Sequence, residues 1–208
     1  MAVVATAGHV DHGKSTLVRL LTGTEPDRWA QERARGLTID LGYAWTDLDG
    51  VHLSLVDVPG HERFAANMLA GLGPVAGVMF VVAADAGWAR QSEEHARVIA
   101  ALGLHEVLLV VTRCDLVEPA TARAVTVDAA DHLGALGLSA REAVRVSGRS
   151  GEGLPRLRAA LRRLALALDP AGATADPSAD PSADSADPSA DPSADSAGPS
   201  ADSTDPCT

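Results

Sequence analysis

The feature that most constrains the fold is a run of eight residues near the amino terminus, Gly8-His9-Val10-Asp11-His12-Gly13-Lys14-Ser15. The run follows an apolar segment, residues 2–7, and opens a segment with helical spacing. The pattern G-x-x-x-x-G-K-S lets backbone N–H groups curl around phosphate oxygens at a helix start. In such a loop Lys14 reaches the outer phosphates and the Ser15 hydroxyl ligates Mg²⁺. A bound nucleoside phosphate is therefore predicted, and the missing G-x-G argues against a Rossmann fingerprint.

Composition singles out the same loop. The sequence has 17 basic residues, and Lys14 is the single lysine among them. Arginine has replaced lysine everywhere else, so this one position is expected to need a compact ammonium rather than a planar guanidinium.

Residues 1–168 alternate between strand-like and helix-like segments. Strands separated by helices form mostly parallel sheets with both faces covered, so we expect an α/β fold of the P-loop NTPase type with six strands. The hairpin Leu41–Val56, turning at Asp49-Gly50, would add one antiparallel edge. The predicted strands are 2–7, 41–48, 51–56, 75–84, 107–112 and 143–146, and the predicted helices are 14–21, 64–70, 91–102, 120–136 and 154–168.

Residues 169–208 differ sharply in composition. They consist of near-repeats of Ala-Asp-Pro-Ser and carry nine aspartates but no Lys or Arg. The whole chain has a net charge of −11, so residues 1–168 carry only −2 of it. Without large apolar side chains, such a segment cannot offset the roughly 1–2 kcal/mol per residue that ordering a backbone costs. We therefore predict one domain, 1–168, followed by a disordered tail, 169–208.

Composition also argues against several classes of protein. No apolar run approaches the roughly 18 residues of a membrane span, and the amino terminus does not resemble a secretory signal. The two cysteines, Cys114 and Cys207, form no disulfide framework, so a reducing cytoplasm is expected. The nearly neutral body carries no basic patch that would indicate DNA binding.

Two further motifs complete a nucleotide site. Asp57-Val58-Pro59-Gly60 ends a strand, where the carboxylate would hold Mg²⁺ through water and the Gly60 N–H would sense a γ-phosphate. Thr112-Arg113-Cys114-Asp115 follows a strand and matches N/T-K-x-D with Arg in place of Lys. Asp115 would accept hydrogen bonds from guanine N1 and its 2-amino group, which adenine lacks, so GTP and GDP are favoured over ATP.

A weaker signal lies after the last predicted strand. Ser147-Gly148-Arg149 occupies the position where GTPases offer a backbone N–H to guanine O6, although Ser-Ala is the usual pair there. The candidate residues of the phosphate loop itself are Asp11, His12, Gly13, Lys14, Ser15 and Thr16.

The combined motifs resemble one family. Gly8–Thr16 is similar to the phosphate loop of elongation factor Tu and its relatives, 35–39 to their first switch and 57–62 to their second. Within that group, Arg35-Gly36-Leu37-Thr38-Ile39-Asp40-Leu41-Gly42-Tyr43-Ala44 and Asn67-Met68-Leu69-Ala70-Gly71 are most similar to the selenocysteine-specific elongation factor. The resemblance covers residues 2–168.

The resemblance implies roles that spacing alone does not. Thr38 would ligate Mg²⁺ and contact the γ-phosphate, and His61 would orient the attacking water in Mg²⁺-dependent GTP hydrolysis. Lys14 and Gly60 would stabilise the reacting phosphate, and Asp11 is a candidate to help hold a monovalent cation. The implied partners are the ribosome, which would stimulate turnover, and selenocysteinyl-tRNA.

Members of this family continue into β-barrel domains that grip aminoacyl-tRNA, whereas here residues 169–208 stand in that place. We therefore expect a truncated or divergent factor that keeps nucleotide binding, and tRNA delivery is put in doubt. Two alternatives stay open: a module that holds guanine nucleotide without effective hydrolysis, and a relative of the GTPase subunit of sulfate activation, which shares R-G-x-T-I-D.

Overall fold

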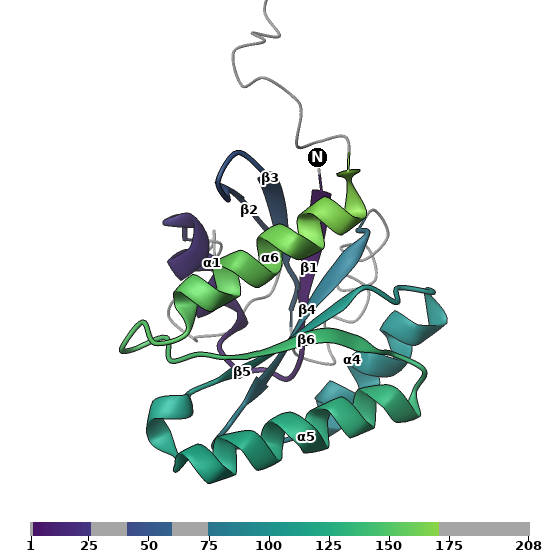
Figure 1. Ribbon diagram of the computed structural model, residues 1–208. Helices are drawn as coiled ribbons and strands as arrows, with labels where there is room; N and C mark the ends of the chain where they lie inside the picture. Colours follow the sequence, from purple (N-terminus) through teal and green to yellow (C-terminus); the bar gives the residue numbers. More distant parts are fainter. Residues whose placement is uncertain (1, 26–40, 60–74, 171–208) are drawn as a thin grey trace, which may run out of the picture. The chain divides into compact units, whose positions relative to one another are not determined.

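The computed structural model describes residues 2–25, 41–59 and 75–170 (Figure 1). The predicted helix 64–70 and the predicted tail 169–208 fall outside these ranges, except for residues 169 and 170. The strands are β1 (Ala2–Ala7), β2 (Gly42–Asp47), β3 (His52–Asp57), β4 (Gly77–Ala83), β5 (Val107–Thr112) and β6 (Ala140–Arg145). The helices are α1 (Lys14–Thr22), α4 (Arg90–Ala101), the 3-10 turn η2 (Cys114–Leu116), α5 (Pro119–Ala135) and α6 (Leu154–Leu168).

The six strands form one sheet in the order β2-β3-β1-β4-β5-β6. Every pairing is parallel except β2 with β3, so the predicted six-stranded, mostly parallel sheet with one antiparallel edge is confirmed. The hairpin turns at Asp49-Gly50 as predicted, with φ of 53° and 79°. Leu48 and Val51 close it with two backbone hydrogen bonds of 3.0 and 3.3 Å, the geometry expected of a two-residue hairpin loop.

Helices cover both faces of this sheet, as the sequence predicts. Helices α1 and α6 pack on one face over a buried aliphatic layer that includes Leu17, Leu55 and Leu161. Helices α4 and α5 pack on the other, over Phe80, Ile99 and Leu133 (Figure 1). Because β3, β1, β4 and β5 are adjacent and parallel, the loops at their carboxyl ends lie at one edge of the sheet, close to one another.

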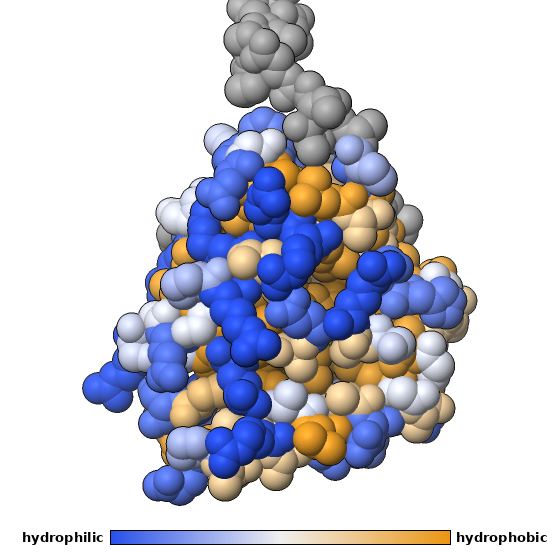
Figure 2. All heavy atoms as spheres, in the orientation of Figure 1, coloured by the Kyte–Doolittle hydropathy of each residue, from blue (hydrophilic) through white to orange (hydrophobic). Residues whose placement is uncertain are grey.

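The arginines of α6 anchor this helix rather than extending freely into water. Arg158 Nη1 donates to the Leu21 carbonyl at 2.8 Å, and Arg162 Nε donates to the Leu48 carbonyl at 3.2 Å. Figure 2, which views this side, shows hydrophilic side chains gathered over α6. The helix therefore lies on the sheet with Leu157, Leu161 and Leu164 buried beneath it.

Strand β6 is the largest departure from the predicted boundaries. It begins at Ala140, three residues before the predicted start, and includes the charged residues Arg141 and Glu142. Because β6 is an edge strand, these side chains reach solvent and form ion pairs, Arg141 with Glu106 and Arg163 with Glu142. An apolar run could not predict a strand start made of charged residues.

Candidate functional site

The loop between β1 and α1 is non-helical and has three residues with positive φ. Gly8, Asp11 and Gly13 have φ of 129°, 62° and 88°, a region that side chains other than glycine rarely adopt. A Cβ atom on Gly8 would collide with the backbone carbonyl of Val81, so only glycine fits there. Helix α1 starts immediately afterwards at Lys14, with Gly13 as its amino-terminal cap. The first N–H groups of a helix have no partner within the helix, and a helix start of this kind favours an anion.

Lys14 folds back over the loop that precedes it. Its Nζ donates to the carbonyls of Gly8 at 3.2 Å and His9 at 2.9 Å, and the residue is only 6% exposed. A buried ammonium is costly unless anions or dipoles surround it. In this structure the dipoles of these two carbonyls face the ammonium, and the side chain is held against the loop before α1.

Helix α4 holds the same loop from a distance of more than 80 residues along the chain. His95 Nδ1 accepts a hydrogen bond from the Gly8 N–H at 3.1 Å, and Gln91 Oε1 accepts one from the Val10 N–H at 3.2 Å. Burial lowers the pKa of His95 to about 3, helped by the charges of Lys14 and His9, so the ring is a neutral acceptor. Sequence reasoning missed both residues, because α4 shows only the periodicity of an ordinary amphipathic helix.

His12 lies buried beneath the loop at 1% exposure. Its Nδ1 faces the Val81 carbonyl at 3.4 Å, and its ring meets the His9 ring edge to face at 4.9 Å. Burial, His9, Lys14 and Arg113 together lower the pKa of His12 to about 4, against the opposing effect of Val81. A neutral, fully enclosed ring supports the shape of the loop.

Asp57 ends β3 directly beside this loop and is completely buried. Its Oδ1 accepts from the Thr6 hydroxyl at 2.7 Å, and that hydroxyl oxygen accepts in turn from the Val58 N–H at 3.1 Å. Burial raises the pKa of Asp57, while the Ser15 and Thr6 side chains and Lys14 oppose the rise. The other oxygen, Oδ2, is buried and has no hydrogen-bond partner within the described ranges.

This carboxylate and hydroxyl fit a magnesium ion. Mg²⁺ in nucleotide sites takes one or two carboxylates, and phosphates and water supply the remaining ligands. The Asp57 Oδ2 atom is an orphaned acceptor beside Ser15, and both residues carry the oxygen chemistry that Mg²⁺ requires. Within residues 2–25, 41–59 and 75–170, no three His, Cys, Asp or Glu side chains come together to form a metal site of their own.

The segment after β5 is joined to the phosphate loop. The Thr112 hydroxyl donates to the His12 carbonyl at 2.7 Å, and Arg113 Nη2 donates to the Asp11 carbonyl. Arg113 itself has a left-handed backbone, with φ of 55°, and caps η2. Asp115 lies in this turn and is exposed, so its carboxylate is open to a ligand. The structure thus brings the predicted base-reading and phosphate-binding segments together.

Ser147-Gly148-Arg149 follows β6 and lies against the start of α1. A Cβ atom on Gly148 would stand 3.4 Å from Thr16 Cγ2 and 3.5 Å from Leu20 Cδ1, ordinary packing distances. Ser147 is buried, its Oγ accepts from the Ser150 N–H at 3.0 Å, and Arg149 is exposed. The turn therefore lies close to the start of α1, and the Gly148 departure from Ser-Ala reflects no lack of space.

Three predicted catalytic residues, Thr38, Gly60 and His61, lie outside the described residues. Their roles stay predictions.

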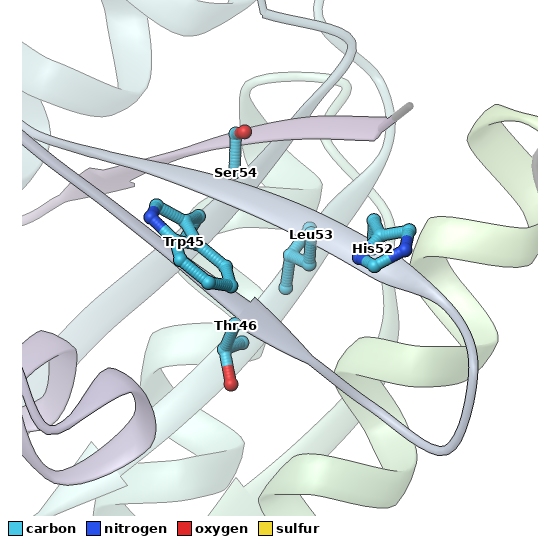
Figure 3. Close-up of a pocket in the computed structure, with 5 residues that line it drawn as sticks. All are labelled: Trp45, Thr46, His52, Leu53 and Ser54. Atoms are coloured by element: carbon cyan, nitrogen blue, oxygen red, sulfur yellow. The ribbon is translucent and has the colours of Figure 1, made fainter. Parts of the chain in front are cut away.

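A small cavity of about 210 Å³ lies elsewhere, on the β2–β3 hairpin (Figure 3). Trp45 and Ser54 are register partners on one side of the hairpin, and Trp45 is 72% exposed. Figure 3 shows Thr46 pointing to the other side, where it is buried against α1. The lining contains none of the predicted site residues.

Comparison with known proteins identifies the family. A family model described as the elongation factor Tu GTP binding domain matches residues 1–166. The chain belongs to this family. The selenocysteine-specific elongation factor of Haemophilus influenzae is 50% identical over 113 residues, which are 54% of this chain and 18% of that protein. The one from Desulfomicrobium baculatum is 39% identical over 169 residues, 81% of this chain and 27% of that protein.

Solved structures agree with that assignment. A crystal structure of a bacterial selenocysteine-specific elongation factor, EF-Sec, superposes with a TM-score of 0.77 at 36% identity and covers 81% of this chain and 29% of that one. The chain thus has the fold of an elongation factor Tu GTP-binding domain and spans less than a third of the length of these relatives. No helix among the described residues is long and apolar enough to span a membrane.

Proposed function

We propose that this chain binds GTP and GDP together with Mg²⁺ and hydrolyses GTP, as the nucleotide-binding domain of a selenocysteine-specific translation elongation factor. The observation that carries the proposal is the loop Gly8–Ser15, with its left-handed glycines and its folded-back Lys14 beside the buried carboxylate of Asp57. Family membership and the selenocysteine-specific relatives support the guanine nucleotide and the translational role.

Phosphate and Mg²⁺ binding would fall to the loop before α1 and to Asp57. The N–H groups from Gly13 to Thr16 would bind the phosphates, and Lys14 would leave its two loop carbonyls to contact the outer phosphate oxygens. Ser15 and Asp57 would hold Mg²⁺, which neutralises the charge that develops on the transferred phosphoryl group. Asp11 and His12 would shape the loop.

Guanine recognition would fall to the loops after β5 and β6. Asp115 would accept from the base, Thr112 and Arg113 would hold that loop against the phosphate loop, and Ser147-Gly148-Arg149 would offer a backbone donor. Hydrolysis would need Thr38, Gly60 and His61 in the two switches, with the ribosome as the stimulating partner. We expect the chain to act in the cytoplasm, and selenocysteinyl-tRNA binding would depend on further domains of the kind found in longer relatives.

Titration of fluorescent GDP, GTP and ATP analogues tests the nucleotide assignment. The wild type should bind both guanine nucleotides and discriminate strongly against ATP, because ATP leaves the Asp115 carboxylate without donors. Asp115→Asn should reduce that preference while the protein stays folded. Equal affinity of the wild type for ATP would remove the guanine assignment.

Turnover is tested separately. GTP hydrolysis should be slow alone and faster with ribosomes, and His61→Ala should abolish the stimulated rate without changing GDP affinity. Guanine nucleotide binding with no hydrolysis under either condition would leave a nucleotide-holding module, the alternative function.

A further inference from the structure

Two strained backbone positions in this molecule are joined by one side chain. Among the described residues, the non-glycine residues with positive φ are Asp11, Asp49 and Arg113. The hairpin turn accounts for Asp49. The other two belong to different loops, and Arg113 Nη2 donates to the carbonyl of Asp11. Left-handed backbone at such residues persists only where surrounding contacts impose it, and it gathers at functional sites.

The second arm of the same guanidinium is also engaged. Arg113 Nη1 donates to Asp85 Oδ2 at 3.2 Å, with the two side chains 39% and 32% exposed. Asp85 follows β4, and its neighbour Ala84 donates its N–H to the Thr112 carbonyl at 2.9 Å. Three loops, after β1, β4 and β5, therefore meet at one guanidinium.

Arginine makes this arrangement possible because its nitrogens have a fixed planar geometry. When Asp85 holds Nη1, the direction of Nη2 is set as well, and Nη2 is the atom that closes the loop at Asp11. A lysine has a single ammonium on a flexible stem, so a carboxylate at residue 85 could not aim it in the same way. The Arg in T-R-C-D and the Asp after β4 thus act as a matched pair.

We propose that Asp85 is a positioning residue for nucleotide binding, which acts by orienting Arg113 so that the base-reading loop closes on the phosphate loop. This inference rests on the proposed function and adds to it a residue outside the predicted motifs. Asp85 touches no ligand itself. Its loss frees the guanidinium to turn into solvent and leaves the Asp11 carbonyl without its restraint.

A double-mutant cycle on fluorescent GDP binding tests the pair. Asp85→Ala should weaken GDP binding about three- to fivefold, mainly through faster dissociation. In the Arg113→Lys background the same change should alter GDP affinity by less than about 1.5-fold. Lysine has one ammonium and no second nitrogen whose direction Asp85 could fix. Asp85→Asn, which keeps an acceptor oxygen, should recover part of the loss.

Glu106→Ala is the matched control, because Glu106 also pairs with an arginine across two elements, at 2.7 Å, but at the opposite end of β5. It should leave GDP affinity unchanged. An unchanged affinity in Asp85→Ala, or equal weakening in both backgrounds, overturns the inference. If Asp85→Ala fails to fold, Asp85→Asn replaces it in the cycle. Failure of the wild type to bind GDP would reject the proposed function as well, whereas wild-type binding with a flat cycle rejects this inference alone.

Discussion

At the carboxyl ends of β1, β3 and β5 the buried side chains include the polar residues Thr6, Asp57 and Thr112, whereas beneath α6 they are aliphatic. Asp57 and Leu161 are equally closed to water, yet one is a carboxylate with an unsatisfied oxygen and the other is a core leucine. Burying a polar group without a partner costs free energy, and burying an aliphatic one releases it. The aliphatic side of the molecule thus contributes stability, whereas the buried polar groups reduce it unless a ligand satisfies them.

Lys14→Ala, at the polar end, should have the largest effect on ligand binding. Removing the ammonium should reduce GDP affinity about a thousandfold, or roughly 4 kcal/mol, because the phosphates lose a direct charged partner. The melting temperature should fall little, since the change also removes a buried charge. Isothermal titration and thermal melting of the same sample measure both effects. Tight GDP binding by the variant would contradict the assigned role.

Leu161→Ala probes the opposite region. The leucine is fully buried in the layer under α6, so its truncation should cost about 3 kcal/mol in the free energy of unfolding. Urea unfolding measures that loss. Affinity for GDP, measured at a temperature where the variant stays folded, should change less than twofold. A large loss of affinity would mean that the two regions are not separable.

Lowering the pH should reduce the free energy of unfolding, because two buried histidines must stay neutral in the folded protein. Folding lowers the pKa values of His95 and His12 to about 3 and 4. Below pH 6.5 the unfolded chain therefore binds protons at these two residues that the folded chain does not bind. Stability is therefore lost as pH falls, by about 1 kcal/mol for each histidine between pH 7.5 and 5.5. His95→Gln, which keeps an acceptor for the Gly8 N–H, should reduce that loss. An identical pH dependence in wild type and variant would contradict it.

The sequence predicted the sheet, the β2–β3 hairpin and the glycine-bounded loop before α1 because their signals are local. Alternating apolar and helical segments, Asp49-Gly50 and the glycine-bounded loop each specify structure within a few residues. The contacts of His95 with Gly8 and of Asp85 with Arg113 join residues 87 and 28 positions apart, so no local pattern announces them. The start of β6 was not predicted for a related reason, because its charged residues form ion pairs with residues of other segments.

Gly148→Ala gives the smallest expected effect and tests the turn after β6. Its backbone φ is not in the left-handed region, and a Cβ atom would meet α1 at ordinary contact distances. The variant should be stabilised by about 0.5 kcal/mol through a less flexible unfolded chain. Differential scanning calorimetry would detect the rise in melting temperature, with GDP affinity retained. A loss of affinity would indicate that the bound base lies close enough to residue 148 to clash with an added methyl group.

All of the proposed roles require a polyphosphate bound in the loop before α1. The most direct measurement is a titration of isotope-labelled protein with GDP and Mg²⁺, followed by the backbone amide resonances. The largest shifts are expected at Gly13, Lys14, Ser15 and Thr16, with little change in the hairpin around Trp45. Unchanged loop amides, or shifts confined to the hairpin, would contradict polyphosphate binding in this loop.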